Sequence, residues 1–323
     1  MKKFEDLKLF IGPMSKNVVD SVLECDDKLI KNIAFIPSRR QIEYNGGYVN
    51  NWTTKGFKDY LDRRVCIQRD HGGPGQGTTE DDGFTSFKTD AENFDIIHVD
   101  PWKKYQDYEA GLAKTIECMK YIYEVNSDVL FEVGTEESIR KFTQQELEKF
   151  LNDLQKSLPS PVYDNIQFAV VQSGVGLDLL NRRNTGVFSL ERLTKMCEIT
   201  TKYGIKSKEH NGDYLSTNDI QIRFNNGLNA INIAPEFGQI ETSCYLEVMT
   251  EKQKELFYKI CLESSRWCKW VSLDDIQSLE QLILVCGHYV FAHKDFKLIE
   301  PNINNAVRDK MKNRIFEILK VVN

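Results

Sequence analysis

Eight short apolar runs along the first three quarters of the chain constrain its fold more than any other feature. Most are near-continuous rather than alternating, as expected for strands of a parallel sheet that is buried on both faces. The runs are Leu7–Ile11, Ile33–Ile36, Arg64–Gln68, Ile96–Val99, Val129–Val133, Ile166–Val171, Gly204–Lys208 and Ala230–Ile233. Eight parallel strands are the number that closes an α/β barrel.

Segments with apolar residues three or four positions apart separate these runs and predict helices. They span residues 15–29, 108–123, 143–158, 189–203 and 216–225, with Ser189 as a predicted N-cap. This alternation predicts a (β/α)8 TIM barrel over residues 1–250. Helical patterns at 251–268, 273–291 and 303–322 predict a C-terminal helical appendage, residues 251–323, packed on the barrel. The segment 72–94, rich in Gly, Thr and Asp, is expected to be a long binding loop.

Composition excludes several classes of protein. The 323 residues carry a formal net charge of -6, so no basic surface suggests a nucleic-acid partner. No apolar stretch is long enough to predict a membrane span, and the charged start Met1–Asp6 lacks the apolar core of a signal peptide. The eight cysteines form no CxxC pair and are expected to be reduced thiols. We therefore expect a cytoplasmic protein.

Chemically versatile residues follow three of the predicted strands. They are Asp70 and His71, then Glu132, and then His210. Because barrel enzymes place their chemistry at the carboxyl ends of strands, these side chains are expected to meet in one pocket. His71 and His210 with a carboxylate suit an open divalent metal site, and Asp70 and Glu132 suit proton transfer.

Further strand-end residues are candidates for substrate binding. Two guanidinium groups at the rim suit a phosphate or carboxylate, although a solvated or salt-bridged pair fits as well. The set comprises Arg39, Arg40, Gly47 in a tight turn, Gln172, Asn211, Asp213 and Glu236. For His98, inside a predicted strand, core packing and a pocket role are both open. His288 and His293 lie in the C-terminal helical patterns, where structural or surface roles are expected.

Several of these blocks, in this order, resemble a known family, the non-catalytic subunit of class II D-tagatose-1,6-bisphosphate aldolase. The resemblance covers most of the chain up to about residue 250. The blocks are Gln41 with Gly46–Tyr48, Asp70–Pro74, Glu132–Glu136, Val170–Val175, Glu209–Tyr214 and Ile233–Glu236. That family is similar to the zinc-dependent class II ketose-bisphosphate aldolases, and some of its relatives are ketose C4 epimerases.

The resemblance implies roles for individual residues. Asp70 corresponds to the proton-transfer aspartate, His71 and His210 to zinc ligands, and Glu132 to the glutamate of the fifth-strand region. The remaining zinc histidine of the aldolases falls at Gln172, which is a departure from the pattern. The phosphate-binding segment corresponds to Asn232–Glu236, where a carboxylate disfavours a phosphate.

Two functions of different classes follow. The first is a metal-dependent aldolase (a lyase) or epimerase acting on a ketose, sugar phosphate or sugar-acid derivative, with zinc as the first candidate ion and manganese or cobalt as alternatives. The second is a catalytically silent subunit that stabilises a class II tagatose-bisphosphate aldolase. The expected partners are accordingly a small sugar or sugar phosphate, and either further copies of the chain or an aldolase subunit. A sugar-binding or regulatory barrel is a third reading, since barrels host many chemistries.

Overall fold

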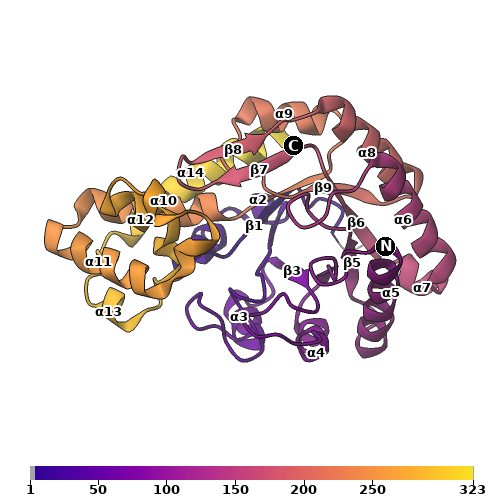
Figure 1. Ribbon diagram of the computed structural model, residues 1–323, viewed down its shortest axis with the longest axis horizontal. Helices are drawn as coiled ribbons and strands as arrows, with labels where there is room; N and C mark the ends of the chain where they lie inside the picture. Colours follow the sequence, from indigo (N-terminus) through magenta and orange to yellow (C-terminus); the bar gives the residue numbers. More distant parts are fainter. Residues whose placement is uncertain (1–3, 323) are drawn as a thin grey trace.

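The computed structural model describes residues 4–322, so the first three residues of the N-terminal segment assessed above lie outside it. Eight parallel strands close a barrel in the order β1-β10-β9-β6-β5-β4-β3-β2 (Figure 1). The barrel strands are β1 (Leu9–Ile11), β2 (Ile33–Phe35), β3 (Cys66–Gly72), β4 (Ile96–Val99), β5 (Leu130–Val133), β6 (Ile166–Val171), β9 (Lys206–Glu209) and β10 (Ala230–Ile233). Each overlaps one predicted run, and the (β/α)8 barrel is confirmed.

Helices surround this barrel. They are α1 (Lys16–Leu23), α2 (Asp27–Ile30), α3 (Thr54–Leu61), α4 (Phe84–Asn93), α5 (Tyr108–Val125), α6 (Gln144–Ser157), α7 (Ser160–Tyr163), α8 (Leu190–Lys202), α9 (Thr217–Asn225) and α10 (Pro235–Val248). Ser189 caps α8 by accepting a hydrogen bond from the Arg192 amide, as predicted. The predicted loop 72–94 is shorter than expected because its second half forms α4. An antiparallel hairpin, β7 (Val175–Asp178) and β8 (Arg183–Gly186), was not predicted.

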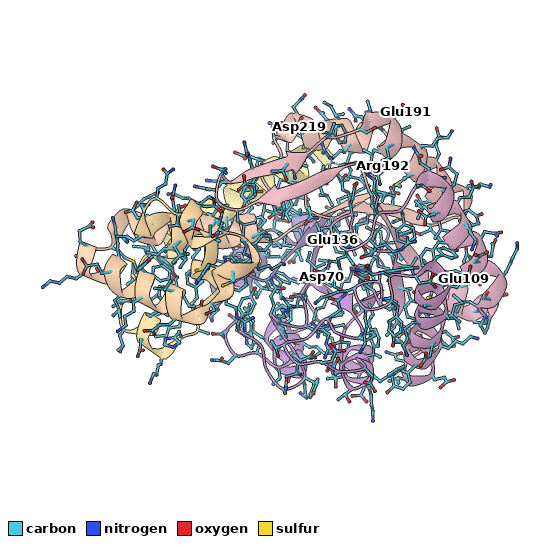
Figure 2. The ribbon with its side chains drawn as sticks, in the orientation of Figure 1. Asp70, Glu109, Glu136, Glu191, Arg192 and Asp219 are labelled. Carbon is cyan, nitrogen blue, oxygen red and sulfur yellow. The ribbon has the colours of Figure 1, made fainter. Side chains whose placement is uncertain are left out.

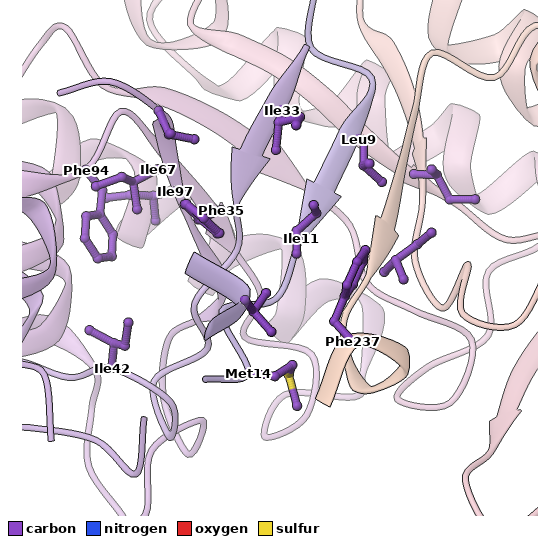
Figure 3. Close-up of a cluster of buried hydrophobic side chains, with 14 of the residues drawn as sticks. Leu9, Ile11, Met14, Ile33, Phe35, Ile42, Ile67, Phe94, Ile97 and Phe237 are labelled. Atoms are coloured by element: carbon purple, nitrogen blue, oxygen red, sulfur yellow. The ribbon is translucent and has the colours of Figure 1, made fainter. Parts of the chain in front are cut away.

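The core lies between the strands and the helices around them. Figure 3 shows side chains of this layer, including Leu9 and Ile11 of β1 and Phe35 of β2, all fully buried. Inside the barrel, Phe10 and Phe168 meet edge to face with ring centroids 5.3 Å apart. The apolar runs are buried on both faces, which explains why they do not alternate.

The C-terminal part divides into two structural roles. The helices α11 (Glu251–Ser264), α12 (Leu279–Cys286) and α13 (Lys294–Lys297), with the 3-10 turns η1 (Arg266–Lys269), η2 (Leu273–Asp275) and η3 (Gly287–Tyr289), form a lobe at one side (orange in Figure 1). The last helix, α14 (Asn304–Val322), returns to pack against α1, α9 and α10. None of the described helices is both long and apolar enough to cross a bilayer.

A glycine inside α5 tests the packing between this helix and the barrel. A Cβ atom at Gly111 would lie 2.2 Å from the buried Trp102 ring, so Gly111→Ala forces overpacking although alanine favours helices. We expect the free energy of unfolding to fall by about 1–3 kcal/mol in denaturant titrations. The exposed Ala113→Gly change in the same helix should cost only about 1 kcal/mol, through lost helix propensity. A more stable Gly111→Ala variant would contradict this packing.

Candidate metal centre

A local irregularity of β3 directs His71 toward the barrel axis. The pairing of β3 with β4 shifts register between Arg69 and Gly72, and His71 has a left-handed backbone with φ 45°. Such bulges re-aim side chains next to active sites, and non-glycine residues seldom adopt positive φ without support. The amide of His71 supplies some of this support by donating to His98 Nδ1 at 3.3 Å.

Three histidines and one aspartate meet at this end of the barrel. The ring centroids of His71, His98 and His210 are 4.9–5.1 Å apart in each pair. One potential ligand atom from each histidine and from Asp70 can be chosen so that all four atoms lie within 4.8 Å of one another. Figure 2 places Asp70 and Glu136 together over the centre of the barrel, away from the labelled residues on the outer helices. We refer to His71, His98, His210 and Asp70 as the histidine cluster.

Each histidine of the cluster has one ring nitrogen held by a separate partner. His71 Nδ1 lies 2.6 Å from Asp100 Oδ2, and His210 Nε2 lies 2.7 Å from Glu132 Oε1. His98 Nε2 lies 3.0 Å from the Gly134 carbonyl oxygen, which can only accept. The second nitrogens of His71 and His210 therefore remain available to the centre of the cluster. His98 Nδ1 faces the same centre and accepts only the long 3.3 Å hydrogen bond from the His71 amide, which a bound ion would replace. Carboxylates and carbonyls in these positions fix the orientation and tautomer of metal-binding histidines.

The fourth member of the cluster has an unsatisfied oxygen. Asp70 Oδ1 is shielded from solvent and has no hydrogen-bond partner among the described residues. It lies 3.8 Å from His71 Nε2. A buried oxygen without a donor is costly unless a proton, a cation or a substrate hydroxyl reaches it. Three imidazole nitrogens form a donor set that fits a divalent ion such as zinc, and this carboxylate oxygen lies beside them.

A buried ion pair supports the cluster from inside the barrel. Lys208 Nζ lies 2.6 Å from Glu132 Oε2, and both side chains are fully buried. Gln68 bonds to both partners, and the ammonium group sits 3.7 Å from the centroid of the Phe10 ring. Burial raises the pKa of Glu132, but Lys208 and the neighbouring histidines lower it well below its usual value. Glu132 is thus an ionised acceptor that holds His210.

Negative charge surrounds the cluster. Burial lowers the pKa of His71, but the charges of Asp70, Asp100 and Glu136 outweigh this effect and raise it to about 10. Burial raises the pKa of Glu136, whereas His71 and His210 lower it to about 2. The arrangement therefore stabilises positive charge at its centre, which an imidazolium or a metal ion can provide.

Among the described residues, three cations without a carboxylate ion-pair partner lie near one another and near the acidic residues of the site, a position that we call its mouth. Arg40 Nε donates to the Gly77 carbonyl at 3.4 Å, and Lys103 Nζ donates to the Gly75 carbonyl at 2.9 Å. Lys269 of η1 packs on the Trp270 ring, with Nζ 4.3 Å from its centroid. The pKa of Lys269 is lowered from its usual value. Burial is the main cause, and the charges of Arg40 and Lys103 act in the same direction, whereas those of Glu136 and Asp70 oppose it.

Among the described residues none of these three cations forms an ion pair, unlike Arg39, which pairs with Glu43 and Asp81 at 2.5 Å each. Arg39 also donates to the Gly73 carbonyl, so its guanidinium group fixes the loop after β3. The two arginines that the sequence offered together therefore differ: Arg39 is buried and saturated, whereas Arg40 is free to meet a ligand.

Other predicted substrate residues make structural contacts. Gln172 accepts from the Phe142 amide at 2.8 Å and donates to the carbonyls of Thr135 and Arg140. Its amide joins loops, while the residue also lines a small pocket beside His210 and Glu136. A Cβ at Gly47 would lie 2.1 Å from the Gln41 carbonyl oxygen, so only glycine fits this turn.

The segment after β9 places its polar residues in different surroundings. Asn211 donates to Glu136 Oε2 at 2.7 Å, which brings it to the edge of the cluster. Asp213 accepts from the amides of Ala234 and Glu236 at the start of α10, and burial and Glu236 raise its pKa to about 7. Glu236 pairs with Arg314 of α14 at 2.6 Å and so turns outward.

Sequence reasoning left several members of the site unassigned. For His98 the sequence left core packing and a pocket role both open; in the structure it lies opposite Glu132 in the register of β4 and β5. Asp100, two residues later, follows the same strand end as the other candidates. Lys208 gave no signal beyond its place in the strand, because its partners come from strands distant in the sequence.

Comparisons with solved structures agree with the barrel fold. No family model matches the chain, and no curated relative matches it in sequence. A probable tagatose 6 phosphate kinase from Sinorhizobium meliloti 1021 is similar in structure, with a TM-score of 0.70 and 13% identity over 97% of this chain and 87% of that one. A fructose-bisphosphate aldolase from Campylobacter jejuni has a TM-score of 0.61 and 12% identity, over 100% of this chain and 91% of that one. The fructuronate-tagaturonate epimerase UxaE from Cohnella laeviribosi has a TM-score of 0.60 and 10% identity, over 98% of this chain and 81% of that one. At these identities the likeness concerns the fold.

Proposed function

We propose that this chain is a metal-dependent aldolase- or epimerase-type enzyme that acts on a ketose carrying an anionic group. The observation that carries the proposal is the histidine cluster, in which three imidazoles and Asp70 converge while separate partners hold each ring. The fold that the chain shares with an aldolase and a ketose-acid epimerase supports the same class.

A divalent ion held by His71, His98 and His210 would supply positive charge to the oxygen of a ketose carbonyl. Asp70 Oδ1 would accept the proton of the C4 hydroxyl, so that C4 becomes an aldehyde while the C3–C4 bond breaks and its electron pair passes to the C2 carbonyl. The proton would return when the bond re-forms. If the C3–C4 bond re-forms on the opposite face of the C4 aldehyde, the outcome would be epimerisation at C4 instead of cleavage. Glu136, held by Asn211, would receive hydrogen bonds from neighbouring hydroxyl groups.

The unpaired cations favour an anionic substrate. Arg40, Lys103 and Lys269 come from three separate segments, and a phosphate or carboxylate would offset their mutual repulsion. The sequence argument against a phosphate rested on Glu236, and this carboxylate is already paired with Arg314. We therefore place the anionic end of the substrate at the mouth formed by these cations.

This placement predicts a selective loss of substrate binding. Arg40→Met and Lys269→Met should each raise KM for a ketose phosphate or a keto-uronate about tenfold, since a hydrogen bond to a charged group contributes about 1.5–3 kcal/mol. Steady-state kinetics checks this result, with Lys259→Met, an exposed lysine near Glu263, as the matched control. Unchanged KM values in both variants would contradict the placement.

The alternative, a silent subunit of a class II aldolase, rested on the family resemblance and on the missing ligand at Gln172. His98 offers a third nitrogen from a different strand, so that departure does not by itself remove a metal site. The test is a screen of the purified chain, loaded with zinc, manganese or cobalt, against ketose phosphates, keto-uronates and neutral ketoses. Turnover that is lost in His98→Ala supports the enzyme. A metal-free chain that only activates a separately supplied aldolase supports the silent subunit.

A further inference from the structure

A cavity of about 160 Å³ lies between the barrel and the C-terminal lobe, and none of its lining residues belongs to the histidine cluster. One wall comes from the start of α1 and from the loop at Tyr48–Asn50. The opposite wall comes from η3, α13 and the start of α14, and Glu241 of α10 also lines it. The cavity therefore exists only where the lobe meets the barrel.

The most informative residue of this cavity is His288. Its side chain is 1% exposed, and neither ring nitrogen has a hydrogen-bond partner among the described residues. Burial, reinforced by Lys269, lowers its pKa to about 3, so the ring is neutral and presents one N–H donor and one acceptor. Gly238 allows this position, since a Cβ there would lie 2.8 Å from His288 Cβ. Buried polar atoms of this kind require a partner from water or a ligand.

The charged groups around the cavity form ion pairs with groups of opposite charge. Lys16 pairs with Asp20 at 2.7 Å, and Lys297 pairs with Glu300 at 2.8 Å. Arg308 also pairs with Asp20, at 3.4 Å. Among the described residues, each of these exposed or half-buried charges on the walls therefore has a partner of opposite charge and does not require an ionic ligand.

The buried carboxylate at the base is satisfied by neutral donors. Glu241 Oε1 accepts from Asn17 and Tyr245 at 2.8 Å each, and Oε2 accepts from Ser15. Arg308 Nε lacks a hydrogen bond but is ion-paired with Glu24 at 2.9 Å. Among the described lining residues, the two nitrogens of His288 are thus the buried side-chain atoms with neither a hydrogen bond nor an ion pair. The rings of Tyr48 and Phe291 add apolar surface against which C–H groups can pack.

We propose that this cavity binds a small uncharged polyhydroxyl compound, a polyol or short-chain sugar, at a site separate from the histidine cluster. Hydroxyl groups both donate and accept, which is what a neutral imidazole with two open nitrogens requires. A cavity of about 150 Å³ holds a six-carbon ring, so about six to eight non-hydrogen atoms fit, as in glycerol or erythritol. Because both the barrel and the lobe contribute walls, the bound compound holds the lobe against the barrel and stabilises the fold.

The probes for the test are glycerol and erythritol at millimolar concentration, followed by isothermal titration calorimetry and by thermal unfolding. We expect saturable binding and a rise in Tm of about 2 °C or more at saturation. Polyols also stabilise proteins non-specifically by exclusion from the surface, but that effect is linear in concentration. Saturation at millimolar concentration therefore distinguishes the site.

Three variants locate the binding. His288→Phe removes both nitrogens, Ala292→Met fills the cavity from its rim, and each should abolish the saturable component. His71→Ala/His210→Ala should bind the polyols as the wild type does, which also separates this proposal from the metal-dependent function. The proposal is overturned if the polyols act equally and linearly in all variants. Saturable binding of inorganic phosphate without binding of erythritol would likewise overturn it.

Discussion

The Lys208→Met variant is expected to lose about 3–5 kcal/mol of unfolding free energy, measured by denaturant titration. Lys208 and Glu132 are both fully buried and form an ion pair inside the barrel. Removing the ammonium group leaves the Glu132 charge buried, with Gln68 and His210 as its remaining hydrogen-bond partners. The large expected effect comes from this uncompensated charge rather than from the net stabilisation by the pair.

A double variant separates these two contributions. In Glu132→Gln/Lys208→Met no buried charge is left unpaired, so we expect at least about 1 kcal/mol of the loss to return. Lys195→Met, a change at an exposed lysine that pairs with Glu198, should alter stability by less than about 0.5 kcal/mol. A single Lys208→Met variant as stable as the Lys195 control would refute the buried pair.

Asp70→Asn should lower kcat by about 10²–10⁴-fold while the metal content stays that of the wild type. The amide keeps the shape of the side chain but cannot accept the substrate proton that we assign to Oδ1. Because the three imidazoles of the cluster remain, an ion should still bind. Steady-state kinetics and elemental analysis on the same preparations check both halves of this prediction.

The matched control for this variant is Asp164→Asn, a change at an exposed aspartate after α7. It should leave kcat and metal content unchanged. If Asp70→Asn lost the metal as well, Asp70 would be a ligand rather than a proton carrier. An unaltered kcat would remove Asp70 from the reaction altogether.

The barrel could be predicted from sequence because burial on both faces leaves a local trace in each strand. The hairpin β7–β8 escaped prediction since Arg183–Gly186 is polar and partly exposed. The helix α10 escaped for a different reason: Gln239, Glu241 and Thr242 are buried polar residues, which blurs the apolar periodicity. Gln239 and Glu241 also have partners in distant segments, which cannot be read from the helix alone.

For the site, strand-end position brought Asp70, His71 and His210 together, as the barrel topology requires. The roles of residues that act through long-range pairing could not be read in this way. Arg39 and Arg40 are neighbours in sequence, yet only the first meets Glu43 and Asp81. Lys269 reaches the mouth of the site from the C-terminal lobe, a placement set by tertiary packing.

The most direct test of this account is the metal content of the purified chain by elemental analysis, for the wild type and for His71→Ala/His210→Ala. The account predicts close to one divalent ion per wild-type chain and its loss in the double variant. A wild-type chain that binds no zinc, manganese or cobalt even after reconstitution would contradict the metal-dependent function.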